Sequence, residues 1–153
     1  MKKIILVFLY LSALILNPGA HAAPGDLSVN GQWQYDGFLH DGIRYPNPNP
    51  NLVLVFTFYE GGLSWLYWFR HGENGHCESL AKYTVNENNL SQLTIWENPL
   101  NAPTCPQDSG SGADEVSTTP YSIEGQELRL HLELDGRPFL YILKYIGPSE
   151  PQP

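Results

Sequence analysis

Residues 52–70 read LVLVFTFYEGGLSWLYWFR. Two runs of apolar, β-branched and aromatic residues flank Glu60-Gly61-Gly62, and glycine readily adopts the positive φ that a tight turn needs. This stretch therefore predicts a β-hairpin. Large apolar side chains stand on both faces of each run, because successive residues of a strand point to opposite sides. Such a hairpin is either covered on both sides or exposes aromatic rings for binding.

Six further segments have the composition and alternation of strands. In the segment ELRLHLEL, four leucines alternate with charged residues and histidine, so the leucines are expected to face inward. Leu93 and Ile95 are expected to face inward in the same way. The predicted strands outside the hairpin are 31–35, 78–85, 90–97, 117–123, 127–134 and 139–146.

Two long segments between the runs are predicted to be loops. Residues 36–51 hold Pro46, Pro48 and Pro50 among asparagines, and proline cannot donate to a regular ladder of hydrogen bonds. Residues 98–116 are rich in Pro, Ser, Gly and Asp. The other predicted strands are joined by short turns, and no segment has a convincing helical period.

Eight short strands in sequence without a helix predict an all-β fold, a single antiparallel meander. A meander of this size buries its apolar face by curling until its first and last strands pair, which gives a β-barrel. A β-sandwich is the alternative, because the two long loops could cross between sheets.

The start of the first predicted strand resembles a known family. Gly31-Gln32-Trp33 matches the G-x-W motif of lipocalins and their calycin relatives, and the last strand, with Tyr141, Lys144 and Tyr145, is similar in outline. The family's later loop motifs and its C-terminal helix have no counterpart here. The resemblance implies a lipocalin-like barrel whose closed end is plugged by Trp33. An eight-stranded barrel of this kind is filled by side chains or holds one small ligand.

The N-terminus has the pattern of a secretory signal peptide. Lys2 and Lys3 precede an apolar run from Ile4 to Leu16, and Ala20-His21-Ala22 supplies an A-x-A cleavage site. We therefore expect a signal peptide over residues 1–22, a barrel domain over 23–147 and a flexible tail over 148–153. The expected location is secreted or periplasmic, and no second apolar stretch reaches the length of a transmembrane helix.

The chain is acidic. Its formal charge is −8, and loss of Lys2 and Lys3 with the signal peptide makes it −10. Such a charge repels the phosphates of nucleic acids, so nucleic acid is not an expected partner.

Cys77 and Cys105 are the two cysteines. An even number of cysteines in an exported chain predicts a disulfide, which would close a loop of about 29 residues and contribute about 3 to 4 kcal/mol of stability. Free redox thiols are the alternative, but the pair lacks the C-x-x-C spacing that lowers a thiol pKa.

Two histidines precede Cys77 in the stretch WFRHGENGHCESL, residues 68–80. His71 and His76 are candidate metal ligands if the turn between them brings them together, but zinc would need further ligands. The other interpretation is a turn fixed by the disulfide, with both histidines exposed. No cofactor is expected.

The sequence contains no G-x-S-x-G motif and no carboxylate pair fixed by spacing, so we expect a binding protein that is not an enzyme. The main hypothesis is a barrel that holds a small apolar or amphipathic molecule, because the aromatic content exceeds what a small core can bury. The alternatives are a secreted protein-interaction module, such as an inhibitor or host-directed factor, and a periplasmic metal-binding protein. The expected ligand-binding residues are Trp33, Phe56, Phe58, Trp65, Tyr67 and Tyr141.

Overall fold

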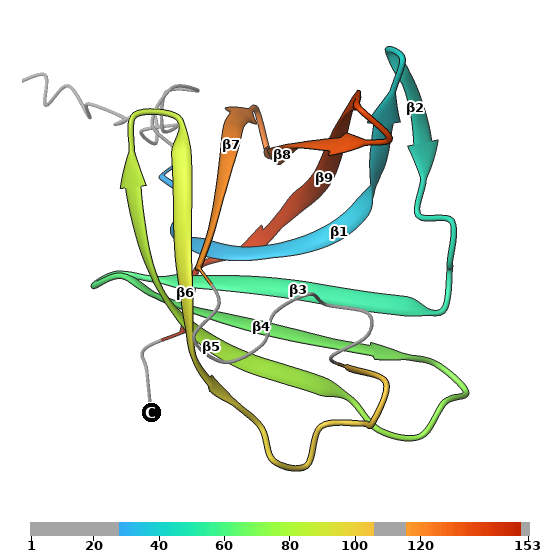
Figure 1. The fold of residues 1–153 in the computed structure, drawn as a ribbon, viewed down its shortest axis with the longest axis vertical. Coiled ribbons are helices and arrows are strands. Elements are labelled where there is room, and N and C mark those ends of the chain that lie inside the picture. The colour runs from blue at the N-terminus through green and yellow to red at the C-terminus, as the bar shows by residue number, and fades with distance from the viewer. Residues whose placement is uncertain (1–27, 106–115, 151–153) are drawn as a thin grey trace, which may run out of the picture.

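The computed structural model describes residues 28–105 and 116–150. Over these residues nine antiparallel strands form one sheet, and Figure 1 shows how the strands are arranged. The predicted signal peptide lies outside the described residues, as do residues 151–153 of the predicted tail. The strands are β1 (Gly31–His40), β2 (Ile43–Pro46), β3 (Leu52–Tyr59), β4 (Leu63–Arg70), β5 (Cys77–Asn86), β6 (Asn89–Glu97), β7 (Val116–Glu124), β8 (Glu127–Leu134) and β9 (Arg137–Gly147).

Eight of these strands close into a barrel. From β3 to β9 each strand pairs with the next one along the chain, and β1 pairs with both β3 and β9. The closing pair runs from Gln32 opposite Gly147 to His40 opposite Phe139. The predicted antiparallel meander barrel is thus confirmed, and the sandwich alternative is wrong.

The prediction of a loop over residues 36–51 is wrong for most of that segment. β1 continues to His40, and Asp41-Gly42 turns the chain into β2, with φ angles of 50° and 75° at the two turn residues. Asp-Gly is a common hairpin turn, but the prolines that follow it favoured the prediction of a loop. Pro46 ends β2, and residues 47–51 form the loop.

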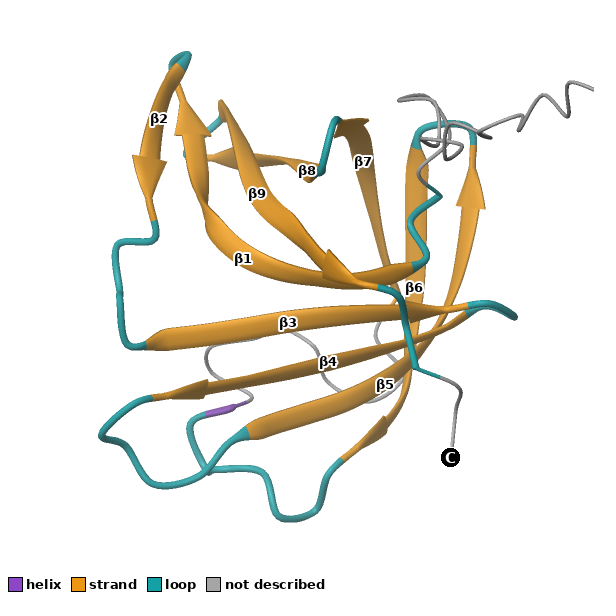
Figure 2. Ribbon diagram, turned by 180° about the vertical axis from the view of Figure 1, so that it is seen from behind, coloured by secondary structure: helices purple, strands orange, loops and turns teal. Residues whose placement is uncertain are grey.

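β2 lies outside the barrel because β1 bends. The first half of β1 pairs with β3, whereas Gly37 to His40 pair with β2, and Figure 2 shows β1 curving away from β3. A Cβ atom on Gly37 would clash with the carbonyl oxygen of Tyr45, so this bend requires glycine. Arg44 of β2 then bridges Asp36 and Glu127, at 2.5 and 2.6 Å.

The main core fills the end of the barrel at which β1 begins. Trp33 is fully buried there, and its Nε1 donates a hydrogen bond to the carbonyl oxygen of Val29 at 2.7 Å. Its ring meets the ring of Tyr145 edge to face. The position matches the floor role that the G-x-W motif implies. The other buried members of this cluster are Val29, Tyr35, Phe58, Tyr83, Leu90, Leu128 and Leu143.

The predicted inward direction of Leu93 and Ile95 is wrong. Leu90 and Thr94 are the buried positions of β6, and Ile95 is 42% exposed. The register explains this, because Thr94 pairs with Ala81 on the inner face and Leu93 pairs with Lys82 on the outer face. A β-bulge at Ile95 then changes the phase of the residues that follow, since Leu80 pairs with Trp96. On β8 the expected alternation begins at Leu128, which is fully buried, but Leu132 and Leu134 are exposed toward the open end.

Candidate functional site

The end of the barrel opposite Trp33 contains a cavity of about 450 Å³. Its lining residues on β3, β8 and β9 lie next to main-core residues of the same strands, so the main core forms the floor of the cavity. Most of its lining is apolar, and the polar lining residues come from four different strands. The lining residues are Leu52, Leu54, Phe56, Leu66, Trp68, Arg70, Gln92, Thr119, Leu130, Leu132 and Tyr141.

The β3–β4 hairpin supplies more than half of this lining. Tyr59 pairs with Leu63 across the Glu60-Gly61-Gly62 turn, so that Phe56 lies opposite Leu66 and Leu54 opposite Trp68. Directly opposite residues share a face of the sheet. Even-numbered residues of both strands therefore face the interior, and odd-numbered ones face outward.

The polar side chains of the cavity are held by neighbours. The guanidinium of Arg70 stands 5.0 Å from the centre of the Trp68 ring and 3.5 Å from the Glu73 carboxylate. Gln92 Nε2 donates a hydrogen bond to Ser64 Oγ at 3.0 Å. Groups fixed in this way can orient a ligand at little cost in side-chain entropy.

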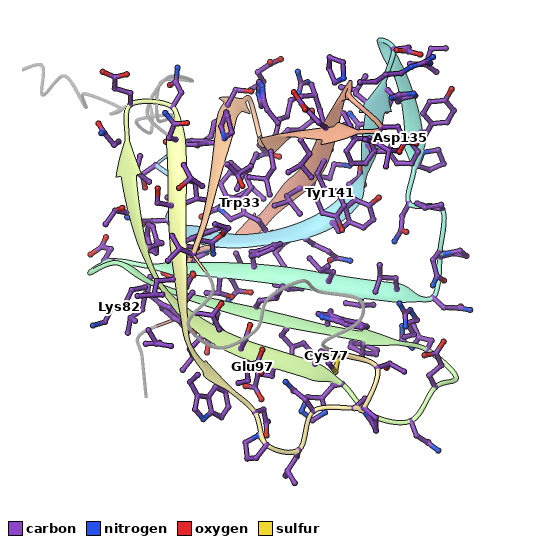
Figure 3. The ribbon with its side chains drawn as sticks, viewed as in Figure 1. Trp33, Cys77, Lys82, Glu97, Asp135 and Tyr141 are labelled. Carbon is purple, nitrogen blue, oxygen red and sulfur yellow. A yellow bond between two sulfur atoms is a disulfide. The ribbon has the colours of Figure 1, made fainter. Side chains whose placement is uncertain are left out.

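Tyr141 places a phenol ring in the cavity wall, and Figure 3 labels it on β9. Its ring stacks on that of Tyr35, with 4.0 Å between the centroids. Burial raises the pKa of the Tyr141 hydroxyl, and the nearby Tyr35 raises it further. The hydroxyl is therefore a neutral hydrogen-bonding group at physiological pH.

The structure brings only some of the predicted ligand-binding residues together. Phe56 and Tyr141 line the cavity. Trp33 and Phe58 belong to the core below it. Trp65 and Tyr67 lie on the outer face of β4, where their rings are 5.6 Å apart.

The predicted ligand-binding residues did not include Trp68 and Leu66, which face the interior in place of Trp65 and Tyr67. The three residues of the Glu60-Gly61-Gly62 turn carry the signal, because loop length fixes the register of a hairpin. Placing Phe58 inward then requires Ser64, Leu66 and Trp68 to face inward as well. The row of aromatic rings on the opposite face of β4 favoured the assignment of that face to the interior instead.

The predicted disulfide joins Cys77 to Cys105, with 5.6 Å between the Cα atoms, and no free cysteine remains. Both residues are buried and pack against Trp68. The bond fixes the end of the segment 98–105 to the first residue of β5. It thereby places that segment against the wall of the open end.

A second cavity, of about 240 Å³, lies beside the disulfide. Leu66 and Trp68 line it from one side, and residues of the 98–105 segment line it from the other. Figure 3 shows Cys77 and Glu97, two of its lining residues, on the same part of the barrel. Ser79, Asn98 and Asn101 also border this smaller cavity.

The two candidate metal ligands pack on different aromatic rings. His71 meets Phe69 edge to face at 5.0 Å, and His76 lies against Tyr67 at 5.5 Å. His76 Nε2 is 3.8 Å from a Glu78 carboxylate oxygen. Among residues 28–105 and 116–150, no group of three or more His, Cys, Asp or Glu side chains is arranged to hold a metal ion.

The arrangement of strands matches solved structures. A lipocalin-like protein from Bacteroides uniformis superposes with a TM-score of 0.53 at 16% identity, over 77% of this chain and 98% of the other. The fold is lipocalin-like. An uncharacterized protein from Bacteroides eggerthii gives the same TM-score at 14% identity, over 78% of this chain and 100% of the other.

No protein-family model and no curated protein matches the sequence. The described residues contain no helix long and apolar enough to cross a lipid bilayer. The lipocalin-like fold, the disulfide and the cavity of the open end are therefore the basis for a functional proposal.

Proposed function

We propose that the protein is an exported, non-enzymatic binding protein that carries a small amphipathic molecule in the open end of its barrel. The observation that carries this proposal is the cavity of about 450 Å³ above the Trp33 floor. Sites for small molecules commonly have volumes of about 300 to 1,000 Å³ and mostly apolar walls with a few polar groups.

The lining supports an amphipathic rather than a purely apolar molecule. Six leucine and phenylalanine side chains offer apolar surface, while Arg70, Gln92, Thr119 and the neutral Tyr141 hydroxyl offer hydrogen bonds. An amphipathic molecule can form hydrogen bonds with these polar groups in place of the water that it displaces, which a purely apolar molecule cannot do.

Export is supported by the signal-peptide pattern and by the buried Cys77–Cys105 bond, since disulfides persist in oxidising compartments. The mass of the protein recovered from the periplasm or culture medium tests this part. We expect a mature chain that begins at residue 23 or 24. Recovery of an unprocessed chain would contradict export by cleavage.

Binding can be tested with an environment-sensitive fluorescent fatty-acid analogue. We expect it to bind and to quench tryptophan emission, and replacement of Trp68 by Phe should remove much of that quenching because Trp68 lines the cavity. Trp65→Phe, on the outer face of the same strand, is the matched control and should leave the quenching unchanged.

A cavity-filling pair makes the test stricter. Leu54→Trp fills the open end, whereas Val53→Trp adds the same side chain to the outer face of β3, opposite Phe69. We expect only Leu54→Trp to reduce binding. Equal binding by both variants would exclude the cavity as the site at which the analogue binds.

A protein-interaction role is the second candidate. It is favoured by three large apolar side chains close in sequence that are exposed: Ile95 at 42%, Trp96 at 39% and Leu100 at 79%. A variant carrying Trp96→Ser and Leu100→Ser keeps the cavity of the open end intact. If a partner is captured from the cell envelope by the wild type and lost by this variant, the surface role is supported.

A further inference from the structure

The two cavities of the open end share a wall. Leu66 and Trp68 line the larger cavity and also the smaller one beside the disulfide. Both side chains face the barrel interior, and the Trp68 side chain is buried between the larger cavity and the disulfide. Leu66 and Trp68 thus separate the two cavities, and a molecule seated in the larger cavity reaches the smaller one past Trp68.

The β-bulge at Ile95 turns a carboxylate into the smaller cavity. Without the bulge, the inward positions of β6 would continue from Thr94 to Trp96. The extra residue shifts the phase, so that Trp96 points outward and Glu97 lies directly opposite Ser79. Bulges that re-aim a side chain are common next to functional sites.

Most polar side chains around the smaller cavity are already engaged. Glu78 accepts hydrogen bonds from Trp65 Nε1 at 2.9 Å and from Asn98 Nδ2 at 2.6 Å. Asn101 pairs with the backbone of Glu78 through both ends of its amide. Ser79 and Glu97 make no side-chain hydrogen bond or ion pair with any described residue. They are the acceptors left for a ligand.

We propose that the amphipathic ligand ends in an ammonium group, which Glu97 and Ser79 bind in the smaller cavity. This inference rests on the proposed function and names the end group that the site selects. The apolar part of the ligand occupies the larger cavity, and its polar end passes Trp68.

The charges around the site agree with this assignment. The described residues that line the smaller cavity include two carboxylates and no lysine, arginine or histidine. A primary ammonium carries three donors, and the Glu97 carboxylate and Ser79 hydroxyl offer oxygen acceptors on neighbouring strands. Arg70, a cationic side chain of the open end, borders the larger cavity instead.

The test compares decylammonium, decanol and decanoate, three ligands with the same chain and different end groups. Their dissociation constants are measured by displacement of the fluorescent fatty-acid analogue at pH 7, below the concentrations at which they form micelles. The wild type is compared with Glu97→Gln, Ser79→Ala and the control Glu133→Gln, which removes the same charge from an exposed position at the same end of the barrel.

We expect the wild type to bind decylammonium about tenfold more tightly than decanol, as one charge-assisted interaction would give. Glu97→Gln should bring this ratio close to one without weakening the binding of decanol. Ser79→Ala should lower the ratio by a smaller factor. Glu133→Gln should preserve it, which separates the local carboxylate from the overall negative charge.

Two results would overturn the inference while leaving the proposed function intact. One is a wild type that binds decanol or decanoate at least as tightly as decylammonium. The other is an unchanged ratio in Glu97→Gln. If the wild type binds neither the analogue nor any of the three ligands, the proposed function fails, and the assignment of Glu97 fails with it.

Discussion

At the scale of single residues, Trp33 is held in several directions at once. Its indole is fully buried, its Nε1 donates to Val29, and its ring lies 5.2 Å from that of Tyr145. The resemblance through Gly31-Gln32-Trp33 implied that Trp33 plugs one end of the barrel, and the complete burial of Trp33 agrees. The structure adds that Gly31 leaves room for the Tyr145 ring. The cavity residues had no comparable local signal.

Replacing Trp33 with Ala should lower the free energy of unfolding by about 3 to 5 kcal/mol, because the change leaves a large void in a well-packed core. Urea denaturation followed by circular dichroism measures this loss. Trp96→Ala is the control and should change the stability by about 0.5 kcal/mol or less, since Trp96 is 39% exposed. Similar losses in both variants would contradict the floor role of Trp33.

Glu127 makes the stability depend on pH. Burial acts to raise its pKa, but the hydrogen bonds from Arg44 and Arg129 outweigh burial and hold the pKa below its ordinary value of 4.5. A carboxyl group with a lowered folded-state pKa stabilises the fold above its ordinary pKa, and this contribution is lost as the pH falls through the folded-state value.

We therefore expect Glu127→Gln to be less stable than the wild type at pH 7, by about 1 kcal/mol or less, as is usual for an ion pair near the surface. The difference should begin to shrink as the pH falls below 4.5, where the unfolded chain binds the proton first, and it should vanish once the pH has passed through the lower pKa of the folded state. Urea midpoints at pH 7, 4 and 3 test this. A difference that grows in acid would show that the carboxylate does not stabilise the fold.

At the scale of elements, the β3–β4 hairpin shows which features could be predicted from the sequence and which could not. Its two strands and its turn were predicted from residues 52–70, and the pairing of Tyr59 with Leu63 agrees. The inward face of β4 was misjudged, because both of its faces carry large apolar groups. The bulge at Ile95 could not be predicted, since a bulge exists only relative to the partner strand.

The bend of β1 at Gly37 is expected to hold β2 in place. Gly37→Ala would force the new methyl group against the Tyr45 carbonyl oxygen, so β2 should detach while the barrel stays closed. Hydrogen exchange measured by mass spectrometry should then show faster exchange at residues 43–46. Gln34→Ala, on the same strand, is the control and should keep the protection of β2.

At the scale of the whole molecule, the barrel is closed by the pairing of the first and last strands, and the disulfide fixes one wall of its open end. Closure was predictable because an antiparallel meander with one apolar face has few ways to bury it. The cavity was not, because its volume depends on which side chains face each other across the interior. Those contacts follow from register and bulges that only the folded sheet defines.

Removing the disulfide should cost about 3 to 4 kcal/mol of stability, because the unfolded chain regains the freedom of a loop of about 29 residues. The double variant Cys77→Ser, Cys105→Ser tests this by urea denaturation. The reduced wild type serves as a second form without the bond, and it should unfold at a similar urea concentration. Loss of less than 1 kcal/mol in both forms would show that the 98–105 segment is held by its other contacts.

Closure of a barrel pairs the two edge strands of a sheet with each other, but β2 lies outside the barrel and has a free edge. β2 pairs with β1 alone among the described strands, so its other side is an unpaired edge. The strand is only four residues long and ends at Pro46, with Pro48 and Pro50 directly beyond it. Proline has no amide hydrogen, and short edges that contain it are poor templates for a strand from another molecule. At the β2 edge, concentrated copies of this protein thus find a poor starting point for growing into amyloid-like stacks.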